Sequence, residues 1–412
     1  MISISNTTAT LAWRNLWRHS RRTLLTIAAM VFADTLLVFM LGLQFGQYRM
    51  MIDNSLRVFT GQMQVQARGY LDEPHMFRSI PAADKLATSI RNNTRLDAVS
   101  VRGYGFALVS SGARTIGAQI SGVDPQHEPL VSSIPGLVKQ GRYLQGSNSN
   151  ELVVGSTLAR NLKVSPGDEL TLLGSGRDGS IAATVAPVVG IFESGNRDLD
   201  RQMLSMPLDT FREVFSMGDH AHSIIIGGER SQADSIAAGA RAALPADGEL
   251  VLLSWEKLLP GLKQAIQADF TSAWFMYLVL IVLVAFGVLN TMLMSVLERT
   301  HEFGILLALG VRHGRLGRMI ITESAVLAAI GLLLGMLAGG MVIWYFRVHG
   351  FTYPGMEAMG ERFNIPSVLH PEVSLRSLLP GPLAVFIATL LASLYPIWHM
   401  RKLRPIEALQ TI

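Results

Sequence analysis

Residues 275–297 read FMYLVLIVLVAFGVLNTMLMSVL, an apolar run without a charged side chain. A helix needs roughly 20 apolar residues to cross a hydrocarbon core about 30 Å thick, so this run predicts a membrane span. Three further segments reach the required length: Leu24–Phe45, Met319–Phe346 and Leu378–Met400. The sequence therefore predicts four transmembrane helices.

The composition agrees with a membrane protein. Of 412 residues, 49% are hydrophobic and 16% are charged, and the mean hydropathy is +0.33. Ordinary soluble domains carry about a quarter charged residues, so a purely soluble protein and a disordered chain are both excluded. The chain has no Cys, which excludes a disulfide scaffold, a thiolate zinc site and cysteine catalysis.

Basic residues flank the predicted spans in three clusters. These are Arg14, Arg18, Arg21 and Arg22; Arg299, Arg312, Arg315 and Arg318; and Arg401, Lys402 and Arg404. With four spans, all three clusters fall on one side, which the positive-inside rule makes cytoplasmic. Both termini are then predicted to be cytoplasmic. The net charge of +4 reflects this orientation, and no nucleic-acid partner is expected.

The predicted fold is a polytopic α-helical membrane protein with one span, a large α+β extracytoplasmic domain, and then three spans. The first span is too long for the roughly 7–15-residue core of a signal peptide, so we expect a retained anchor. The predicted segments are a cytoplasmic amphipathic N-terminal segment (1–23), spans at 24–46, 271–297, 319–346 and 378–400, a periplasmic domain with stalk helices (47–270), a cytoplasmic coupling loop (298–318), a periplasmic loop (347–377) and a cytoplasmic tail (401–412).

Within the periplasmic domain, hydrophobic periodicity predicts strands and helices in mixed order. Met63, Val65 and Ala67 alternate with glutamines, as in a half-buried strand. Further strands are predicted at Thr115–Ile120, Glu151–Gly155, Glu169–Leu173, Ile181–Ile191 and Leu250–Leu253. Helices are predicted around Leu86 and Ile90, through Leu158 and Leu162, and at Leu208–Phe215, Ser231–Leu244 and Trp255–Phe270, the last as a stalk leading into the second span.

Three polar residues in the spans are candidates for a special role. Asp34 and Glu323 each cost roughly 2.5–3.5 kcal/mol at the centre of a bilayer, so each needs a partner or water. For Glu323, an interfacial ion pair with a nearby residue such as Arg318 is expected. For Asp34, pairing with a polar neighbour such as Asn290 and a direct role in transport both remain open.

Small residues repeat at every fourth position in the third and fourth predicted spans. Gly331, Gly335 and Gly339 form one strip, and Ala384, Ala388 and Ala392 form another. Such strips allow two helices to approach closely in lipid, so we expect helix packing there. A substrate path along the strip is the alternative.

Motifs for catalysis are absent from the sequence. It contains no G-x-x-x-x-G-K-[ST] and no G-x-S-x-G, and His301-Glu302 lacks the second His of a zinc protease. The segment Gly174–Gly179 is predicted to be a hairpin loop. A surface turn is expected at Asp219-His220-Ala-His222, with a weak metal site as the alternative. We therefore expect no catalytic residues, no metal site and no cofactor in this chain.

The segment 295–318 reads SVLERTHEFGILLALGVRHGRLGR. Its charged residues give way to Phe303, Ile305, Leu306, Leu307 and Leu309, which predicts an amphipathic helix at the membrane surface. Such a helix offers both charge and apolar anchors to a groove on another protein. A simple interfacial helix without a partner is the alternative.

The run Glu298–Gly310 closely resembles the signature of the FtsX-like permeases of ABC transporters, a family that includes lipoprotein-releasing permeases and the permease part of macrolide exporters. Glu323 within Thr-Glu-Ser, the tail Arg404–Leu409, and the outer segments Asn150–Gly155 and Val164–Asp168 are similar to that family as well. Leu11–Arg18 and Thr60–Tyr70 look most like the lipoprotein-releasing group. Macrolide exporters carry a fused ATPase, and none is present in this sequence.

The resemblance implies a permease subunit of the bacterial inner membrane without catalytic activity of its own. ATP and Mg²⁺ would be bound by a separate ABC ATPase, present in two copies. The other implied partners are a second permease copy or a paralogue, a periplasmic adaptor or carrier protein, and membrane lipids. Residues implied to dock the ATPase are Glu298, Arg299, Glu302, Phe303, Gly304, Leu306 and Gly310.

The implied function is the extraction or export of a lipoprotein or another hydrophobic cargo. Two alternatives remain at this stage. One is a mechanical regulator of a periplasmic partner such as a cell-wall hydrolase, driven by the ATPase without transport. The other is a macrolide or peptide efflux permease.

Overall fold

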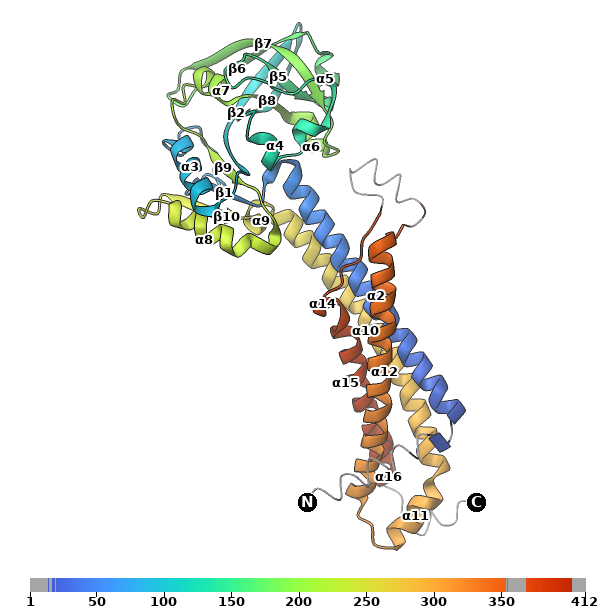
Figure 1. Ribbon diagram of the computed structural model, residues 1–412. Helices are drawn as coiled ribbons and strands as arrows, with labels where there is room; N and C mark the ends of the chain where they lie inside the picture. The colour runs from blue at the N-terminus through green and yellow to red at the C-terminus, as the bar shows by residue number, and fades with distance from the viewer. Residues whose placement is uncertain (1–13, 15–16, 19, 353, 355–367, 402–412) are drawn as a thin grey trace. The chain divides into compact units, whose positions relative to one another are not determined.

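The computed structural model describes residues 14, 17, 18, 20–352, 354 and 368–401 (Figure 1). The predicted N-terminal segment up to residue 13, part of the predicted 347–377 loop and the tail beyond 401 lie outside these residues. The described residues form two compact units. The membrane unit comprises residues from 14–49, 266–354 and 368–401, and the outer unit comprises residues 50–265.

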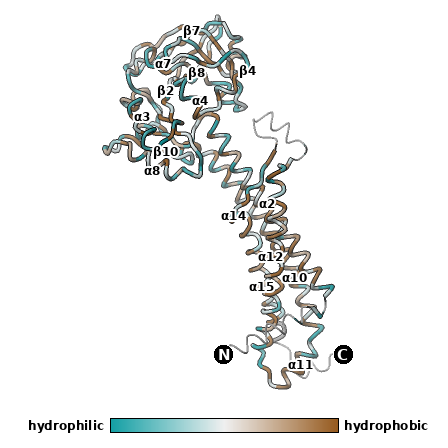
Figure 2. The backbone as a smooth tube through the Cα atoms, in the orientation of Figure 1, coloured by the Kyte–Doolittle hydropathy of each residue, from teal (hydrophilic) through white to brown (hydrophobic). Residues whose placement is uncertain are grey.

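Long apolar helices build the membrane unit, and they are hydrophobic along most of their length (Figure 2). They are α2 (Ser20–Ser55), α10 (Pro260–Glu298), α12 (His313–His349) and a fourth, interrupted helix made of α14 (Leu375–Leu378), α15 (Pro380–Ala392) and α16 (Leu394–Arg401). Four helical segments in the described residues are long and apolar enough to cross a membrane, which confirms the four predicted spans.

The helices differ in detail from the predicted spans. Helix α2 runs to Ser55 and continues as a π-helical turn, η1 (Leu56–Thr60). Before α10, the short helix α9 (Trp255–Leu258) ends and Pro260 begins the new helix, a position that suits a residue without an N–H. The fourth helix breaks between Ala392 and Leu394, because Pro396 removes a helical hydrogen bond and its ring clashes with the preceding turn.

The outer unit is built on a ten-stranded sheet with the order β10-β1-β9-β2-β3-β8-β5-β7-β4, in which β6 pairs with both β2 and β7. The strands are β1 (Met63–Ala67), β2 (Val99–Ser111), β3 (Arg114–Val123), β4 (Val138–Gly141), β5 (Leu152–Gly155), β6 (Glu169–Ser175), β7 (Ile181–Phe192), β8 (Met203–Pro207), β9 (Ser223–Ile226) and β10 (Leu250–Ser254). Because β6 bridges β2 and β7, strands β2, β3, β8, β5, β7 and β6 close into a barrel.

Two large hydrophobic cores fill this unit, and a smaller cluster contains Val123, Ile134, Leu144, Val153, Phe192 and Met203. Alternate residues of the barrel strands share one core with α5 (Ser156–Leu162) and α7 (Leu208–Val214). A second core lies between the strands β10, β1, β9 and the start of β2 and the helices α3 (Ala83–Thr94) and α8 (Ala233–Ala243). The remaining short elements are α4 (Glu128–Val131), η2 (Ile134–Leu137), α6 (Arg197–Gln202) and η3 (Arg230–Gln232).

The predicted strands and helices of this domain are present, but the predicted stalk helix Trp255–Phe270 is interrupted at Leu259. The predicted hairpin loop Gly174–Gly179 does connect β6 to β7, although β6 extends to Ser175. Three central strands, β2, β8 and β9, were not predicted. The strands β8 and β9 and the first half of β2 are buried on both faces, which removes the alternation that marks a strand. Gly103 of β2 also has no side chain because the Phe211 ring occupies that space, where a Cβ would lie 2.3 Å from the ring.

Candidate functional site

A short helix, α11 (Thr300–Ala308), joins the ends of α10 and α12. Between α10 and α11, Arg299 has backbone angles outside the helical region. After α11, Gly310 has φ +86°, a conformation that favours glycine. The chain thus changes direction at Arg299 and again at Gly310. These two turns place α11, which lies within the motif 295–318, at the end of the helix bundle.

The faces of α11 differ in exposure. Phe303 is 1% exposed and packs with Val296, Leu316, Ile320 and Ile397. On the other face, Ile305 is 43% and Leu309 is 76% exposed, and Gly310 is exposed as well. The residues predicted to dock an ATPase are therefore divided: Phe303 and Gly304 are buried, Leu306 is half-buried, and Gly310 lies at the surface.

Arg299 is surrounded by acidic and aromatic groups. Its Nη1 donates to Glu323 Oε1 at 3.0 Å and Oε2 at 3.3 Å, and its Nε lies 3.5 Å from Glu302 Oε2. Its guanidinium lies over the Phe303 ring, 5.2 Å from the centroid. The predicted ion pair of Glu323 with a nearby arginine is therefore present, but its partner is Arg299 and not Arg318. Five residues along α12 turn the helix by about 140° past a full turn, which directs Arg318 to solvent.

The two acidic residues at the α10–α11 junction are paired with arginines from the start of the chain. Arg18 Nη1 lies 2.6 Å from Glu302 Oε1, and Arg22 Nη1 lies 2.8 Å from Glu298 Oε2. Burial alone raises the pKa of Glu302, but the hydrogen bond and charge of Arg18, with the nearby charge of Arg299, lower it on balance. The four-residue spacing of both the arginines and the glutamates is the sequence signal for this pairing.

The glycine strip of α12 packs directly against α2. A Cβ at Gly331 would lie 3.1 Å from Met30 Cβ, one at Gly335 2.4 Å from Asp34 Cβ, and one at Gly339 2.7 Å from Val38 Cβ. One turn further, the arrangement reverses and Gly42 of α2 accommodates Ile343. The spacing thus brings two parallel helices into close contact, as small residues do in membranes.

Asp34 lies within this contact and is fully buried. Among the described residues, neither of its carboxyl oxygens has a hydrogen-bond partner. The predicted pairing with Asn290 is wrong, because Asn290 is exposed on α10. Asp34 instead occupies the space that Gly335 leaves open.

Sequence reasoning missed a polar cluster between α2 and α10. Tyr48 donates to Asp269 Oδ2 at 2.6 Å, Gln44 Nε2 donates to the Tyr48 hydroxyl at 2.8 Å, and Tyr277 donates to Gln44 Oε1 at 2.8 Å. The spacing of Gln44 and Tyr48 places them on one helix face. These hydrogen bonds fix the pairing of the first two long helices.

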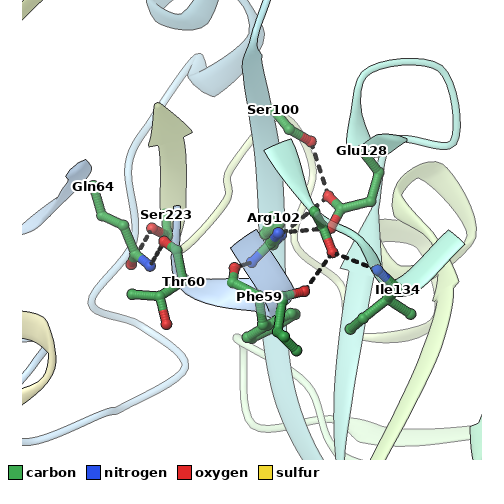
Figure 3. A network of polar contacts seen from close by, with 10 residues as sticks. Phe59, Thr60, Gln64, Ser100, Arg102, Glu128, Ile134 and Ser223 are labelled. Atoms are coloured by element: carbon green, nitrogen blue, oxygen red, sulfur yellow. Dashed lines mark hydrogen bonds and ion pairs between the residues drawn. The ribbon is translucent and has the colours of Figure 1, made fainter. Parts of the chain in front are cut away.

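The outer unit contains a second buried arginine, Arg102 on β2 (Figure 3). Its Nη2 and Nε donate to the two carboxyl oxygens of Glu128 at 2.6 and 3.0 Å, and its Nη1 donates to Phe59 O at 2.5 Å. Ser100 donates to the same carboxylate. Burial lowers the pKa of Arg102, but attraction by Glu128 outweighs it and the pKa is raised.

The predicted surface turn at Asp219–His222 is confirmed only at its start, where Asp219 lies in an exposed turn, and is wrong for His222. His222 is fully buried; its Nδ1 accepts the Tyr104 N–H at 2.9 Å, and its Nε2 lies 3.2 Å from Met76 O. Burial lowers its pKa to about 4. Among the described residues, no group of three or more His, Asp and Glu side chains is placed to hold a metal ion.

The barrel exposes apolar side chains on its outer face. In register, Leu108 of β2 faces Leu173 of β6, which faces Ala183 of β7, and Thr171 faces Val185. The exposed apolar side chains on these three strands are Phe106, Leu108, Leu173, Ile181 and Val185. We call these five residues the barrel patch; exposed clusters of this kind mark interaction surfaces.

Two family models match the chain. The model for the MacB-like periplasmic core domain matches residues 23–243, and the model for the FtsX-like permease C-terminal domain matches residues 274–405. The chain belongs to this family of ABC transporter permeases. The permease spans the membrane with four helices and carries a MacB-like periplasmic domain between the first and second, which confirms the predicted fold class.

Similar proteins include both lipoprotein-releasing and exporter permeases. The lipoprotein-releasing system transmembrane protein LolC of Xylella fastidiosa is 23% identical over 317 residues, which cover 73% of this permease and 74% of LolC. LolE of Haemophilus influenzae is 24% identical over 336 residues, covering 79% and 80% of the two chains. The macrolide export ATP-binding/permease protein MacB of Campylobacter jejuni is 37% identical over 68 residues, covering 16% and 11%.

A search of solved structures finds the periplasmic region of MacB from Actinobacillus actinomycetemcomitans at 16% identity, with a TM-score of 0.36, covering 51% of this permease and 94% of that chain. The sequence relatives are permease components of ABC transporters, which implies an ATPase partner for this permease.

Proposed function

We propose that this permease couples ATP hydrolysis by two separate ABC ATPase subunits to the extraction or export of a lipoprotein or another hydrophobic cargo on the periplasmic side. Two permease chains, either identical or paralogous, would assemble with the ATPases. In this proposal both termini are cytoplasmic, and ATP and Mg²⁺ are bound by the ATPase. The names of the relatives LolC and LolE support the choice of cargo.

The observation that carries the proposal is the position of α11. It is held between the ends of α10 and α12 with Ile305 and Leu309 exposed, while its other face is packed into the bundle. An exposed apolar face on a short, fixed helix fits a groove on a partner protein. The docking surface in this proposal is therefore Ile305, Leu309 and Gly310, with Leu306 at its edge, and Phe303 supports it from within.

Co-purification tests the docking. A tagged permease is co-expressed with an ABC ATPase subunit of the same organism, and retained ATPase is measured. We expect Ile305→Asp with Leu309→Asp to lower retained ATPase at least about tenfold, equivalent to the loss of about 1.4 kcal/mol of binding free energy. Leu173→Asp with Val185→Asp, a matched loss of exposed apolar residues in the outer unit, should leave retention unchanged. Full retention by the α11 variant would refute the assignment.

Reconstitution tests the cargo. Liposomes containing the permease, the ATPase and a triacylated lipoprotein are expected to release lipoprotein when ATP is added. A mechanical regulator would hydrolyse ATP in the same liposomes without releasing any cargo. The barrel patch supports a contact with a periplasmic adaptor or carrier in this proposal, and Leu173→Asp with Val185→Asp should then lower release while ATP hydrolysis continues.

A further inference from the structure

Arg299 contacts three different elements of the membrane unit. It occupies the junction of α10 and α11, its guanidinium binds Glu323 of α12, and it lies beside Glu302 and Phe303 of α11. Its side chain is 11% and that of Glu323 is 8% exposed. Among the described residues, Arg299 is the counter-charge of the buried Glu323 carboxylate, and losing such a partner is costly, so these contacts hold the two helices together.

The acceptor of Arg299 lies at the start of a continuous row on α12. Counting in steps of four from Glu323 gives Leu327, Gly331, Gly335, Gly339 and Ile343, all of them buried. The glycines and Ile343 contact Met30, Asp34, Val38 and Gly42 of α2, which are also four residues apart. Two such rows packed in register behave as interlocking ridges, so α12 and α2 move together along this contact.

We propose that Arg299 is a positioning residue that locks α11 to α12 through Glu323. A force applied to α11 then enters α12 at Glu323 and reaches α2 through the glycine row. The locking itself follows from contacts within this chain. The transmission of force rests on the proposed function, because it requires an ATPase on α11.

The absence of Cys in the sequence allows a direct test of the lock. Thr300→Cys places a thiol on the buried face of α11, where Thr300 is 8% exposed, and Ala308→Cys places one on the exposed face of the same helix. Maleimide labelling of the purified chain in detergent is expected to be slow at 300 and fast at 308. Adding Arg299→Ala should speed labelling at 300 about tenfold, as the helix opens locally, and leave 308 unchanged.

Charge reversal separates the ion pair from general loss of structure. Arg299→Glu alone should open position 300 as Arg299→Ala does, and Arg299→Glu with Glu323→Arg should restore its protection. Monodisperse size-exclusion profiles confirm that the variants are folded, and Arg299→Lys, which keeps the charge but not the two-pronged donor, should give an intermediate rate. Continued protection of position 300 in Arg299→Ala, or failure of the reversed pair to restore it, would overturn the lock.

The transmission of force needs the ATPase and a second readout. In liposomes, Arg299→Ala should keep the ATPase bound, because Ile305 and Leu309 remain exposed, and should lower permease-stimulated ATP hydrolysis about tenfold. Unchanged stimulation in a variant whose position 300 has opened would contradict the transmission. If the unmodified chain retains no ATPase, the proposed function fails, while the maleimide comparison still decides whether Arg299 locks α11.

Discussion

Each unit of this permease contains a buried Arg–Glu pair, and the two pairs differ in their exposure and in the hydrogen bonds of the arginine. Arg102 and Glu128 in the outer unit are 0% and 1% exposed, and Arg102 is hydrogen-bonded through Nε and both terminal nitrogens. Arg299 and Glu323 in the membrane unit are 11% and 8% exposed, and Arg299 Nε has no hydrogen-bond partner within the part of the chain that the structure describes. Both guanidiniums lie over an aromatic ring, Phe59 and Phe303 respectively.

The difference lies in the number of acceptors. In the described residues, Arg102 is paired with one carboxylate, that of Glu128, whereas Arg299 lies between Glu323, held at 3.0 Å, and Glu302, at 3.5 Å. A fully satisfied buried network favours one structure. Arg102–Glu128, which we call the fixed pair, therefore suits an internal support of the outer unit. Arg299–Glu323, which we call the membrane pair, instead joins α10, α11 and α12 at one side chain.

The largest expected effect follows from breaking the fixed pair. Arg102→Ala leaves Glu128 buried without a counter-charge, which should lower the free energy of unfolding of the outer unit by about 3–5 kcal/mol. Hydrogen exchange of β2 and β3 in the detergent-solubilised chain measures this. Arg102→Met with Glu128→Met replaces the pair with apolar groups and should recover most of the loss. A loss below about 1 kcal/mol in Arg102→Ala is what a solvent-exposed salt bridge would give, and it would contradict this prediction.

The next largest effect is expected at acidic pH, which should destabilise the strands that surround the Arg102–Glu128 pair. His222 N–H donates to Arg102 O, and burial lowers the His222 pKa to about 4 despite the opposing hydrogen bond to Met76 O. The unfolded chain then binds the proton more tightly, so stability falls as the pH drops from about 6.5 towards 4, by up to about 3 kcal/mol.

Hydrogen exchange of β9 and β2 as a function of pH checks this acid sensitivity. His222→Asn keeps an acceptor near the Tyr104 N–H and removes the titration, so its profile should be flatter over the same range. Equal pH dependence in the two proteins would assign the effect to another group.

A smaller loss of stability is expected from overpacking the glycine row of α12, which lies beyond Glu323 of the membrane pair. Gly335→Ala adds a methyl group 2.4 Å from Asp34 Cβ, and such overpacking typically costs about 1–3 kcal/mol. The matched control is Gly287→Ala on α10, where a Cβ meets no atom within 4 Å and the helix should gain up to about 1 kcal/mol. Thermal unfolding in detergent compares the two. A neutral Gly335→Ala would show that α2 and α12 are not in tight register.

The sequence predicts the structural elements that depend on a local pattern of residues. The four spans, α11 and strands such as Met63–Ala67 follow from apolar length and periodicity, and the motif 295–318 marks the region of the membrane pair. The partners within that region were not predictable in the same way. Arg299 and Arg318 are both near Glu323, and only the break between α10 and α11 turns Arg299 towards it.

The fixed pair and its surroundings depend on contacts across the sheet. Arg102 reaches Glu128 because β2 lies beside α4, and His222 is buried because β9 pairs with β2 at Arg102–Ser223. Neither contact has a local periodic signal, and a polar run such as Asp219–His222 reads as a turn. The strand β9 and the first half of β2 are buried on both faces and lack the alternation that marks β1, so both strands were missed.

The smallest expected effect concerns the exposed charges around the membrane pair. The Arg18 and Glu302 side chains are 59% and 42% exposed, so solvent screens their attraction, and a double-mutant cycle with alanine should give a coupling of about 0.2–1 kcal/mol that falls with added salt. Because the pKa of Glu302 is lowered, this coupling should persist at neutral pH and fade as the carboxylate is protonated. The Arg22–Glu298 pair, at 27% and 36%, provides the control and should couple somewhat more strongly. A coupling at Arg18 as large as that of the buried Arg299–Glu323 pair would mean that the start of the chain, and not α12, holds α11 in place.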